Sequence, residues 1–240
     1  MNSKYCFIGD VHSQDKPLKA ALDSCEYKGY APILLGDLFD SRNADYSDSY
    51  NVYVQANRAL EMGGYILQSN HQNKLIRYLK GRNVQVKDGL EKTIDELFSK
   101  GGLKPDYILN WLESFPFAVK VRTSKNEYRA AHAFFPNSLK CDNDLDFQLF
   151  YENDLTKYHK SDCMYGITKK TESGMERVAW WNDNSYAKDF IRVGGHYHEY
   201  IVDNYWFKLI DGECGTEASN ARLVCMFLMD DGHYFENYNQ

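Results

Sequence analysis

Histidines, aspartates and an asparagine that could bind metal ions are gathered in five short blocks of the sequence. Five of the seven histidines belong to these blocks, which read Gly9-Asp10-Val11-His12, Gly36-Asp37-Leu38-Phe39-Asp40, Asn70-His71, His132 and Gly195-His196-Tyr197-His198. Asp10 and His12 are two positions apart, so an extended backbone points both side chains the same way, as two ligands of one ion require. The same holds for His196 and His198. The sequence therefore predicts a metal site assembled from separate segments.

The mixture of donor atoms indicates which ions such a site takes. Imidazole, carboxylate and amide groups together suit borderline divalent metals and contain too much nitrogen for a calcium site. The potential ligands also outnumber the positions around one ion. We therefore expect two divalent transition metal ions, with manganese as the first candidate and iron, zinc or nickel as the others.

Regular elements must position these blocks, and the first part of the chain supplies strands and helices in alternation. Short apolar runs at Tyr5–Ile8, Pro32–Leu35 and Tyr65–Leu67 predict strands, and polar residues follow each of them. Helical spacing of apolar residues predicts helices at Leu18–Cys25 and Asn73–Lys80. Since α/β sheets carry their sites at the carboxyl ends of strands, this pattern places the first three blocks where a site is expected.

The second part of the chain is richer in strands. Helical patterns continue over Leu90–Lys100, with Gly101-Gly102 as a stop, and over Asp106–Ser114. The predicted strands are Phe117–Val121, Tyr128–Phe135, Phe190–Val193, Tyr205–Ile210 and Leu223–Met229, the last turning through Asp230-Asp231-Gly232 into Tyr234-Phe235. Residues 137–184 are polar and acid-rich, and a connection of that length predicts small elements of its own or a functional loop. We expect one domain over residues 1–240, with a loop or lid insertion around 137–184.

Length, charge and composition narrow the class of protein. The 240 residues, 43% of them hydrophobic, suffice for one sizeable core. There is no apolar run of about 18 residues and no secretory signal, which predicts a cytoplasmic protein with no membrane partner. The net charge of -6 argues against non-specific coating of nucleic acid. The six cysteines include no Cys-x-x-Cys pair, so we expect reduced thiols, with Cys6 and Cys225 in the core.

Taken in order, the five blocks resemble the calcineurin-like metallophosphoesterase superfamily, whose pattern reads D-x-H, G-D-x-x-D, G-N-H-[DE], H and G-H-x-H. The resemblance spans Gly9 to Asp211 and rests on five separated blocks in the right order. The segment Asn70 to Thr93 is similar to the phosphatase module of bacterial polynucleotide kinase-phosphatases, which belongs with the phosphoprotein phosphatase and diadenosine tetraphosphatase branch. Later stretches resemble the same branch or module, namely Ala131-His132-Ala133, Tyr165-Gly166, Arg177, Trp180-Trp181 and Leu209-Ile210-Asp211.

The resemblance implies a fold, a reaction and a role for each residue. The fold is an α/β sandwich of two mixed β-sheets flanked by helices, and the reaction is hydrolysis of phosphate esters by a hydroxide held between two metal ions. The implied ligands are Asp10, His12 and His198 for one ion and Asn70, His132 and His196 for the other, with Asp37 bridging both. His71 is implied as the acid that protonates the leaving oxygen, with Asp40 orienting its ring.

The sequence departs from the pattern of this branch at three points. In the branch, an arginine that grips phosphate directly follows the second aspartate of the G-D-x-x-D block; here Ser41 intervenes, and the candidate is Arg42. Ser69 and Gln72 replace the usual glycine and acid beside Asn70-His71. The final G-H-x-H block is typical of nucleotidases and nucleases, whereas polynucleotide and protein phosphatases carry G-H-T. The departures leave the reaction unchanged and the substrate open.

These observations predict a metal-dependent phosphoesterase that acts as a phosphatase or phosphodiesterase. The first expectation is hydrolysis of phosphates on nucleotides or nucleic-acid ends, including 2′,3′-cyclic phosphates, favoured by the likeness over Asn70 to Thr93. The alternative is a serine/threonine phosphoprotein phosphatase, favoured by the shared branch and the acidic net charge. A third hypothesis is an inactive metal-binding interaction protein; a missing ligand would favour it, and every ligand is present. The expected partner is thus a phosphorylated small molecule, a nucleic-acid end or a phosphoprotein.

Overall fold

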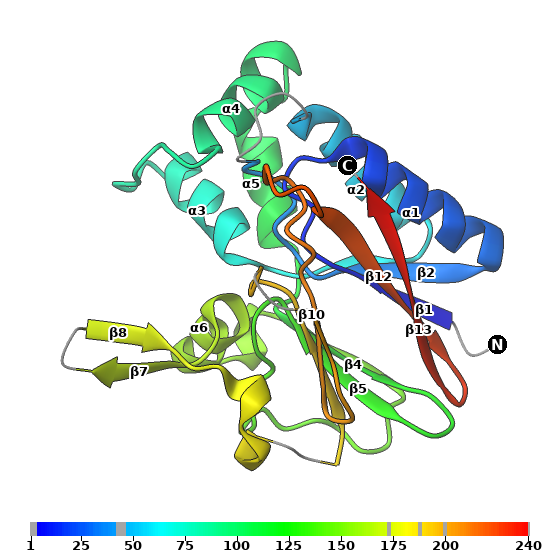
Figure 1. The fold of residues 1–240 in the computed structure, drawn as a ribbon. Coiled ribbons are helices and arrows are strands. Elements are labelled where there is room, and N and C mark those ends of the chain that lie inside the picture. The colour runs from blue at the N-terminus through cyan, green and yellow to red at the C-terminus, as the bar shows by residue number, and fades with distance from the viewer. Residues whose placement is uncertain (1–3, 42–46, 172–173, 187–188, 199–200, 240) are drawn as a thin grey trace.

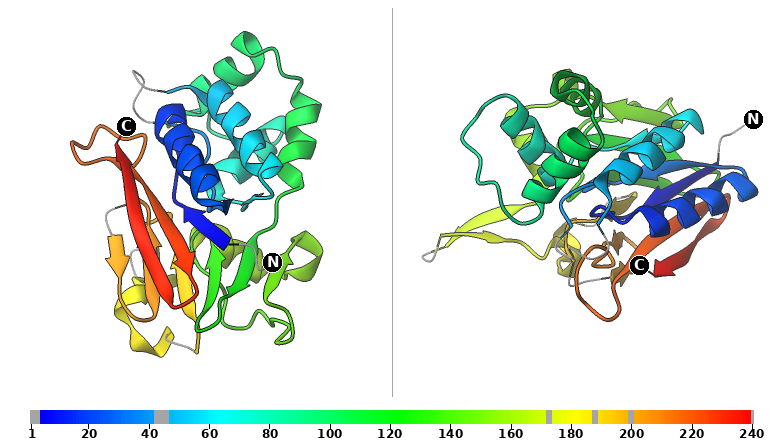
Figure 2. Two further views of the ribbon diagram at one scale, coloured as in Figure 1. Left: turned by 90° about the vertical axis from the view of Figure 1, so that its right-hand side faces the viewer. Right: turned by 90° about the horizontal axis from the view of Figure 1, so that it is seen from above.

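Two mixed β-sheets lie face to face, and a layer of helices covers the outer face of one of them (Figure 1). The structure is a computed structural model and describes residues 4–41, 47–171, 174–186, 189–198 and 201–239. Figure 2 shows the layering from two further sides, with a β-hairpin projecting from the body of the molecule in the view from above. The predicted α/β sandwich is confirmed.

The first sheet brings three of the predicted blocks to one edge. Its strand order is β13-β12-β1-β2-β3. The strands are β1 (Lys4–Ile8), β2 (Tyr30–Leu34), β3 (Tyr65–Ile66), β12 (Arg222–Met229) and β13 (Gly232–Asn239). Strands β1, β2 and β3 are parallel, whereas β12 is antiparallel to both β1 and β13. Because parallel strands end at the same edge of a sheet, the residues that follow β1, β2 and β3 lie close together.

The second sheet delivers the remaining two blocks. Its strand order is β10-β11-β9-β5-β4-β6. The strands are β4 (Ala118–Arg122), β5 (Glu127–Ala131), β6 (Phe147–Phe150), β9 (Ile191–Gly194), β10 (Ile201–Asp203) and β11 (Phe207–Ile210). Strand β9 is parallel to both β5 and β11. His132 directly follows β5, and Gly195-His196 directly follows β9, so these residues also meet at one edge.

Helices α1 to α5 pack on the first sheet, and α6 lies beside the second (Figure 1). Their bounds are α1 (Asp15–Lys28), α2 (Ser49–Glu61), α3 (Asn70–Leu79), α4 (Leu90–Ile94), α5 (Pro105–Glu113) and α6 (Lys157–Tyr165). A π-helical turn, Asp95–Lys100, continues α4, and short 3₁₀ turns cover Glu152–Asp154, Trp180–Asn182 and Asn184–Tyr186. The projecting hairpin consists of β7 (Thr168–Thr171) and β8 (Gly174–Arg177). Within the described ranges, every helix is too short or too polar to cross a membrane.

The central strands are buried on both faces, which explains their uninterrupted apolar runs. Along β1, Cys6 and Ile8 pack into the helical layer, while Phe7 packs between the two sheets. Along β2, Ile33 faces the second sheet and Leu34 faces the helices. Burial of each such side chain contributes about 1.5–3 kcal/mol, so these strands are fixed in the centre of the fold.

Several elements differ from the sequence expectations. The predictions omit α2, whose buried residues Ser49, Val52, Ala56 and Ala59 have helical spacing but mostly small side chains. The predicted strand Tyr128–Phe135 ends at Ala131, because the chain leaves the sheet at His132. The segment 137–184 carries small elements of its own, as expected: β6, α6 and the β7–β8 hairpin. Trp180 and Trp181 within it are buried. All six cysteines are free thiols, and Cys6 and Cys225 are in the core.

Candidate metal centre

The first block reaches the site through a tight loop rather than an extended strand. The backbone φ angles of His12 and Ser13 are 46° and 60°, so the expectation that Asp10 and His12 lie along extended backbone is wrong. The loop folds this way because the backbone N–H groups of Val11 and His12 both donate to the carbonyl oxygen of Asp37, at 3.1 and 2.7 Å. The first block is thereby fastened to the second.

The last block shows the same difference. His196 has a φ of 67°, so it also lies outside extended backbone. Its N–H donates to Asp10 Oδ2 at 2.9 Å. The preceding Gly195 has no room for a side chain, since a Cβ atom there would lie 1.9 Å from Asp10 Oδ1. The last block therefore packs directly against the first.

Four donor groups converge on one side of the site. His132 Nε2 lies 2.7 Å from Asn70 Oδ1 and 3.2 Å from His196 Nδ1. The same nitrogen is 3.4 Å from Asp37 Oδ2. Asp37, His132 and His196 each offer one ligand atom within 4.8 Å of the others. These groups come from both sheets, and they are the set that the sequence assigns to one metal ion together with Asp37.

A second cluster shares Asp37 with the first. His12 Nε2 lies 3.6 Å from Asp37 Oδ2. His12, Asp37 and His71 each offer one ligand atom within 4.8 Å of the others. Asp10 and His198 belong to neither cluster, although both line the same cavity. The structure thus brings the predicted residues together and places Asp37 at the centre, as a bridging ligand requires.

Burial sets the protonation states of the ligand candidates. Desolvation lowers the pKa of His132 to about 4 and lowers that of His196 well below its ordinary value, so both rings are neutral near pH 7. Neutral imidazole is the form that binds metal ions. Burial acts to raise the pKa of Asp37, but His132, His71 and His12 outweigh it and lower the value. Asp37 is therefore a carboxylate.

The buried carboxylates fit a cation. Desolvation, together with Asp211 and Asp37, raises the pKa of Asp10 well above its ordinary value, because negative charges crowd one another there. Asp10 Oδ1 is buried and has no hydrogen-bond partner within the described residues. A divalent ion bound here would relieve this crowding of negative charge, and Asp10 could serve as one of its ligands. The donor set of carboxylate, imidazole and amide groups is suited to transition metals.

His71 is held by a chain of hydrogen bonds. Its Nδ1 lies 2.8 Å from Asp40 Oδ2. The hydroxyl of Thr93 donates to Asp40 Oδ1 at 2.8 Å, and the backbone N–H of Asp40 donates to the same hydroxyl at 3.0 Å. Burial acts to lower the pKa of His71, but Asp37 and Asp40 outweigh it and raise the value. The ring is thus oriented and can hold a proton.

Three charged residues of the cavity lie outside the predicted set. Arg177, Asp211 and Glu213 line it together with Asp10, His12, Asp37, Asn70, His71, His196 and His198. Arg177 and Asp211 occur in stretches that resemble the polynucleotide phosphatase module, which was the available signal, but no motif assigns them a role. Arg42, the candidate phosphate-gripping residue, lies outside the described residues.

Comparison with known proteins finds a curated protein that matches part of the sequence and solved structures that match the whole fold. No family model matches the chain. Asymmetrical bis(5′-nucleosyl)-tetraphosphatase PrpE of Halalkalibacterium halodurans is 35% identical over 104 residues, which cover 39% of this chain and 41% of that protein. A structure assigned as a diadenosine tetraphosphatase aligns with a TM-score of 0.60 and 15% identity, covering 100% of this chain and 96% of the other. A serine/threonine phosphatase from Saccharomyces cerevisiae aligns with a TM-score of 0.58 and 11% identity, covering 100% of this chain and 80% of the other.

The sequence match spans about two fifths of the bacterial tetraphosphatase, and the structural matches span this whole chain. The predicted resemblance to the branch that contains phosphoprotein phosphatases and diadenosine tetraphosphatases is confirmed. The structural matches, at low identity, concern the fold.

Proposed function

We propose that this protein is a phosphoesterase that uses two divalent metal ions to hydrolyse phosphate groups of nucleotides or nucleic-acid ends. The observation that carries the proposal is the convergence of His12, His132 and His196 on Asp37, at the edge where the strands of both sheets end. Asn70 joins this group through its contact with His132. Such ions, when bound, activate water as a nucleophile and neutralise the charge of the phosphate oxygens. Manganese is the first candidate metal, followed by iron, zinc and nickel.

For one ion, the proposed ligands include the histidines of the first cluster; for the other, they follow the sequence resemblance, since Asp10 and His198 line the cavity outside the second cluster. Asn70, His132 and His196 hold one ion. Asp10, His12 and His198 hold the other, and Asp37 joins the two sets. His198 and Asp10 line the same cavity as Asp211. The carboxyl of Asp211 is buried close to these ligands, and burial raises its pKa.

The side chains around the ligands orient the substrate and supply a proton. Arg177 is the one lysine or arginine among the described residues that line the cavity, so it binds the phosphate oxygens. His71, with Nδ1 on Asp40, presents Nε2 to the leaving oxygen and donates a proton to it. His71 thus acts on the leaving group, while Arg177 holds the charged phosphate. Arg42 remains a further candidate for phosphate contact.

The bacterial tetraphosphatase match favours nucleotides as the substrate class. The test is a panel of substrates with manganese: a diadenosine polyphosphate, a phosphorylated oligonucleotide, a 2′,3′-cyclic nucleotide and a phosphopeptide. We expect turnover of at least one nucleotide-containing substrate at a kcat/KM well above that for the phosphopeptide. Preference for the phosphopeptide would identify the alternative, a phosphoprotein phosphatase, and turnover by the Asp37→Asn variant at the normal rate would contradict the site itself.

A further inference from the structure

A second cavity, of about 160 Å³, lies along α3 beyond the metal centre. Asn70, Asn73 and Arg77 are three and four residues apart, so they share one face of this helix. Asn70 belongs to the metal centre, whereas Asn73 and Arg77 line the second cavity. The Asn73 amide donates to the Tyr165 hydroxyl at the end of α6, at 2.9 Å. One helix face therefore leads from the metal centre into this cavity, with Arg77 about 10 Å farther along the axis at 1.5 Å per residue.

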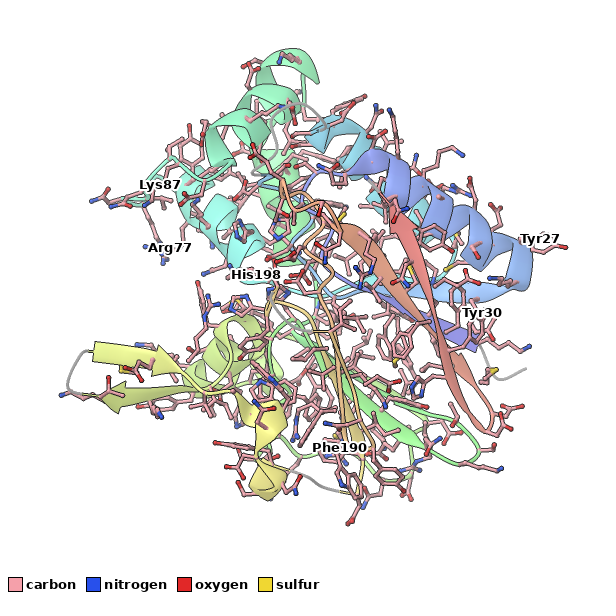
Figure 3. All side chains as sticks on the ribbon, in the orientation of Figure 1. Tyr27, Tyr30, Arg77, Lys87, Phe190 and His198 are labelled. Atoms are coloured by element: carbon pink, nitrogen blue, oxygen red, sulfur yellow. The ribbon has the colours of Figure 1, made fainter. Side chains whose placement is uncertain are left out.

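The rim of the cavity carries positive charge that other residues do not neutralise. Arg77 and Arg82 line it, both are exposed, and neither forms an ion pair with another described residue. Both glutamates of the lining are paired with lysines, Glu113 with Lys80, which also lines the cavity, and Glu152 with Lys160. Figure 3 shows Arg77 extending from α3 toward the side on which the β7–β8 hairpin projects, while His198 lies nearer the centre of the molecule. Two guanidinium groups so placed suit a phosphate.

The interior of the cavity is suited to a ligand with a hydrogen-bond donor and apolar surface, in addition to an anionic group. Gln68 lines it and is 3% exposed, and its side-chain oxygen is buried without a hydrogen-bond partner in the described part of the chain. Phe117 and Met164 add buried apolar surface to the lining. A buried acceptor requires a hydroxyl or amino donor, which a bare phosphate chain lacks and a nucleoside has. Apolar walls, one acceptor and a basic rim together match a nucleotide.

We propose that this cavity binds a nucleotide moiety of the substrate distant from the phosphate that reacts. Arg77 and Arg82 hold its phosphate, and Gln68 accepts a hydrogen bond from its sugar or base. The proposal rests on the function proposed above, and it predicts a preference for substrates in which a nucleotide extends about 10 Å from the reacting phosphate, the helix rise from Asn70 to Arg77. Such substrates are dinucleoside polyphosphates and oligonucleotide ends.

The first test uses binding, so it does not depend on catalysis. Isothermal titration calorimetry on the full chain without divalent ions compares ATP with inorganic tripolyphosphate. We expect ATP to bind more tightly, and Arg77→Gln with Arg82→Gln to weaken ATP binding about 10- to 100-fold, the usual effect of removing charged hydrogen bonds. Gln68→Met should weaken ATP binding and leave tripolyphosphate binding unchanged. Lys16→Gln, which removes one exposed positive charge on α1, is the matched control. Equal binding of ATP by the double variant and the wild type would overturn the proposal.

The second test uses the manganese-loaded enzyme. The double arginine variant should lose about 10- to 100-fold in kcat/KM on diadenosine tetraphosphate, on a 3′-phosphorylated oligonucleotide, or on both, and lose less than about 2-fold on p-nitrophenyl phosphate. A loss confined to one nucleotide substrate identifies which kind the cavity serves. Equal losses on the aryl ester would place the arginines in the metal centre and overturn the subsite. Wild-type protein that hydrolyses none of these esters would contradict the proposed function, while the calorimetry would still decide whether the cavity binds a nucleotide.

Discussion

His71 is oriented so that one ring nitrogen is engaged and the other is available. Asp40 engages Nδ1, and Thr93 fixes Asp40 in turn. The ring lies in edge contact with His12, with centroids 5.1 Å apart. His71 is thus close to the ligand candidates, and its role must be separated experimentally from metal binding.

The His71→Ala variant makes this separation through the leaving group. An alkoxide from ribose or serine needs a proton when it departs, whereas p-nitrophenolate is stable without one. We expect a loss of about 100- to 10,000-fold in kcat on an alkyl phosphate and a clearly smaller loss on the aryl ester. Metal content, measured by mass spectrometry, should be unchanged. Equal losses on both esters, or a missing ion, would show that His71 is a ligand or a phosphate-positioning group.

The matched control is Asp40→Asn, which leaves the imidazole in place but removes one of the two carboxylates, Asp37 and Asp40, that raise its pKa. It should show the same dependence on the leaving group with a smaller loss. Equal losses of kcat on both esters in Asp40→Asn would indicate a structural role for this carboxylate.

The residues that the sequence identifies and those that it misses differ in a physical way. Most of the identified site residues stand in short blocks directly after predicted strands, and His132 falls inside one, so local sequence is enough to find all of them: Asp10, His12, Asp37, Asn70, His71, His132, His196 and His198. Arg177 ends a strand of the projecting hairpin, and Asp211 directly follows β11. Asp211 stands alone after its strand, with no histidine beside it, and Arg177 reaches the cavity only through tertiary packing, which no local spacing encodes. The left-handed backbone at His12 likewise depends on hydrogen bonds to Asp37, distant in sequence.

The turn after strand β9 is packed too tightly to accept a side chain at Gly195. A Cβ atom on Gly195 would lie 1.9 Å from Asp10 Oδ1, so Gly195→Ala must displace either the turn or the carboxylate. Both belong to the proposed ligand sets. We expect this variant to lose metal binding and activity together while the chain still folds, as measured by titration calorimetry with manganese and by circular dichroism. Gly232→Ala, where a Cβ atom meets open space, should bind manganese normally. Normal metal binding by Gly195→Ala would mean that the turn is not part of the site.

Strands β4 and β5 are joined by an ion cluster around Glu127. Its carboxylate lies 2.8 Å from Arg122 Nη2, 2.5 Å from Arg129 Nη2 and 3.5 Å from Lys120 Nζ. The side chain of Lys120 is fully buried and that of Glu127 is 12% exposed. Burial acts to raise the pKa of Glu127, but Arg122, Arg129 and Lys120 outweigh it and lower the value. Glu127 therefore stabilises the fold as a carboxylate.

This cluster predicts a dependence of stability on pH. Because the folded pKa is the lower one, the contribution is fully present above the pKa of an unfolded glutamate, about 4.3, and is lost as the pH falls through the folded value. Glu127→Gln should lower the free energy of unfolding by about 2–3 kcal/mol at neutral pH, since it leaves the buried Lys120 without its carboxylate. The loss should shrink below about pH 4, as measured by urea unfolding. A pH-independent difference between variant and wild type would show that Glu127 acts through packing alone.

For the molecule as a whole, the sequence predicts the central strands better than it predicts helix α2 and the β7–β8 hairpin. The parallel strands β1 and β2 are found because burial on both faces demands continuous apolar runs, visible in Tyr5–Ile8 and Pro32–Leu35. Helix α2 and the hairpin β7–β8 are not found. The buried stripe of α2 has mostly small side chains, and the hairpin is exposed along most of its length, so neither leaves a strong hydrophobic pattern. Weak burial therefore gives a weak signal in the sequence.

The proposed metal ligands come from both sheets, so metal binding should stabilise the whole molecule. Asp37 follows β2 in the first sheet, whereas His132 and His196 follow β5 and β9 in the second. An unfolded chain does not hold these groups together, and an ion that binds only the folded state adds about 2.7 kcal/mol at a concentration of 100 times its Kd. For a chain of this size we expect manganese to raise Tm by about 5–10 °C, at roughly 2–4 °C per kcal/mol.

Calorimetry with and without manganese, alongside hydrolysis of p-nitrophenyl phosphate, tests this expectation in one experiment. Chelation should lower Tm and abolish turnover together, and added manganese should restore both. The Asp37→Asn variant should show little of the shift in Tm and little turnover, because a neutral amide joins two cations poorly and Asp37 contacts His12 and His132 at once. A full shift in Tm for this variant would show that the ions bind elsewhere, and turnover that survives chelation would show that the reaction proceeds without them. The expected pattern, in which stability and activity depend on the same carboxylate, is specific to a site built between the two sheets.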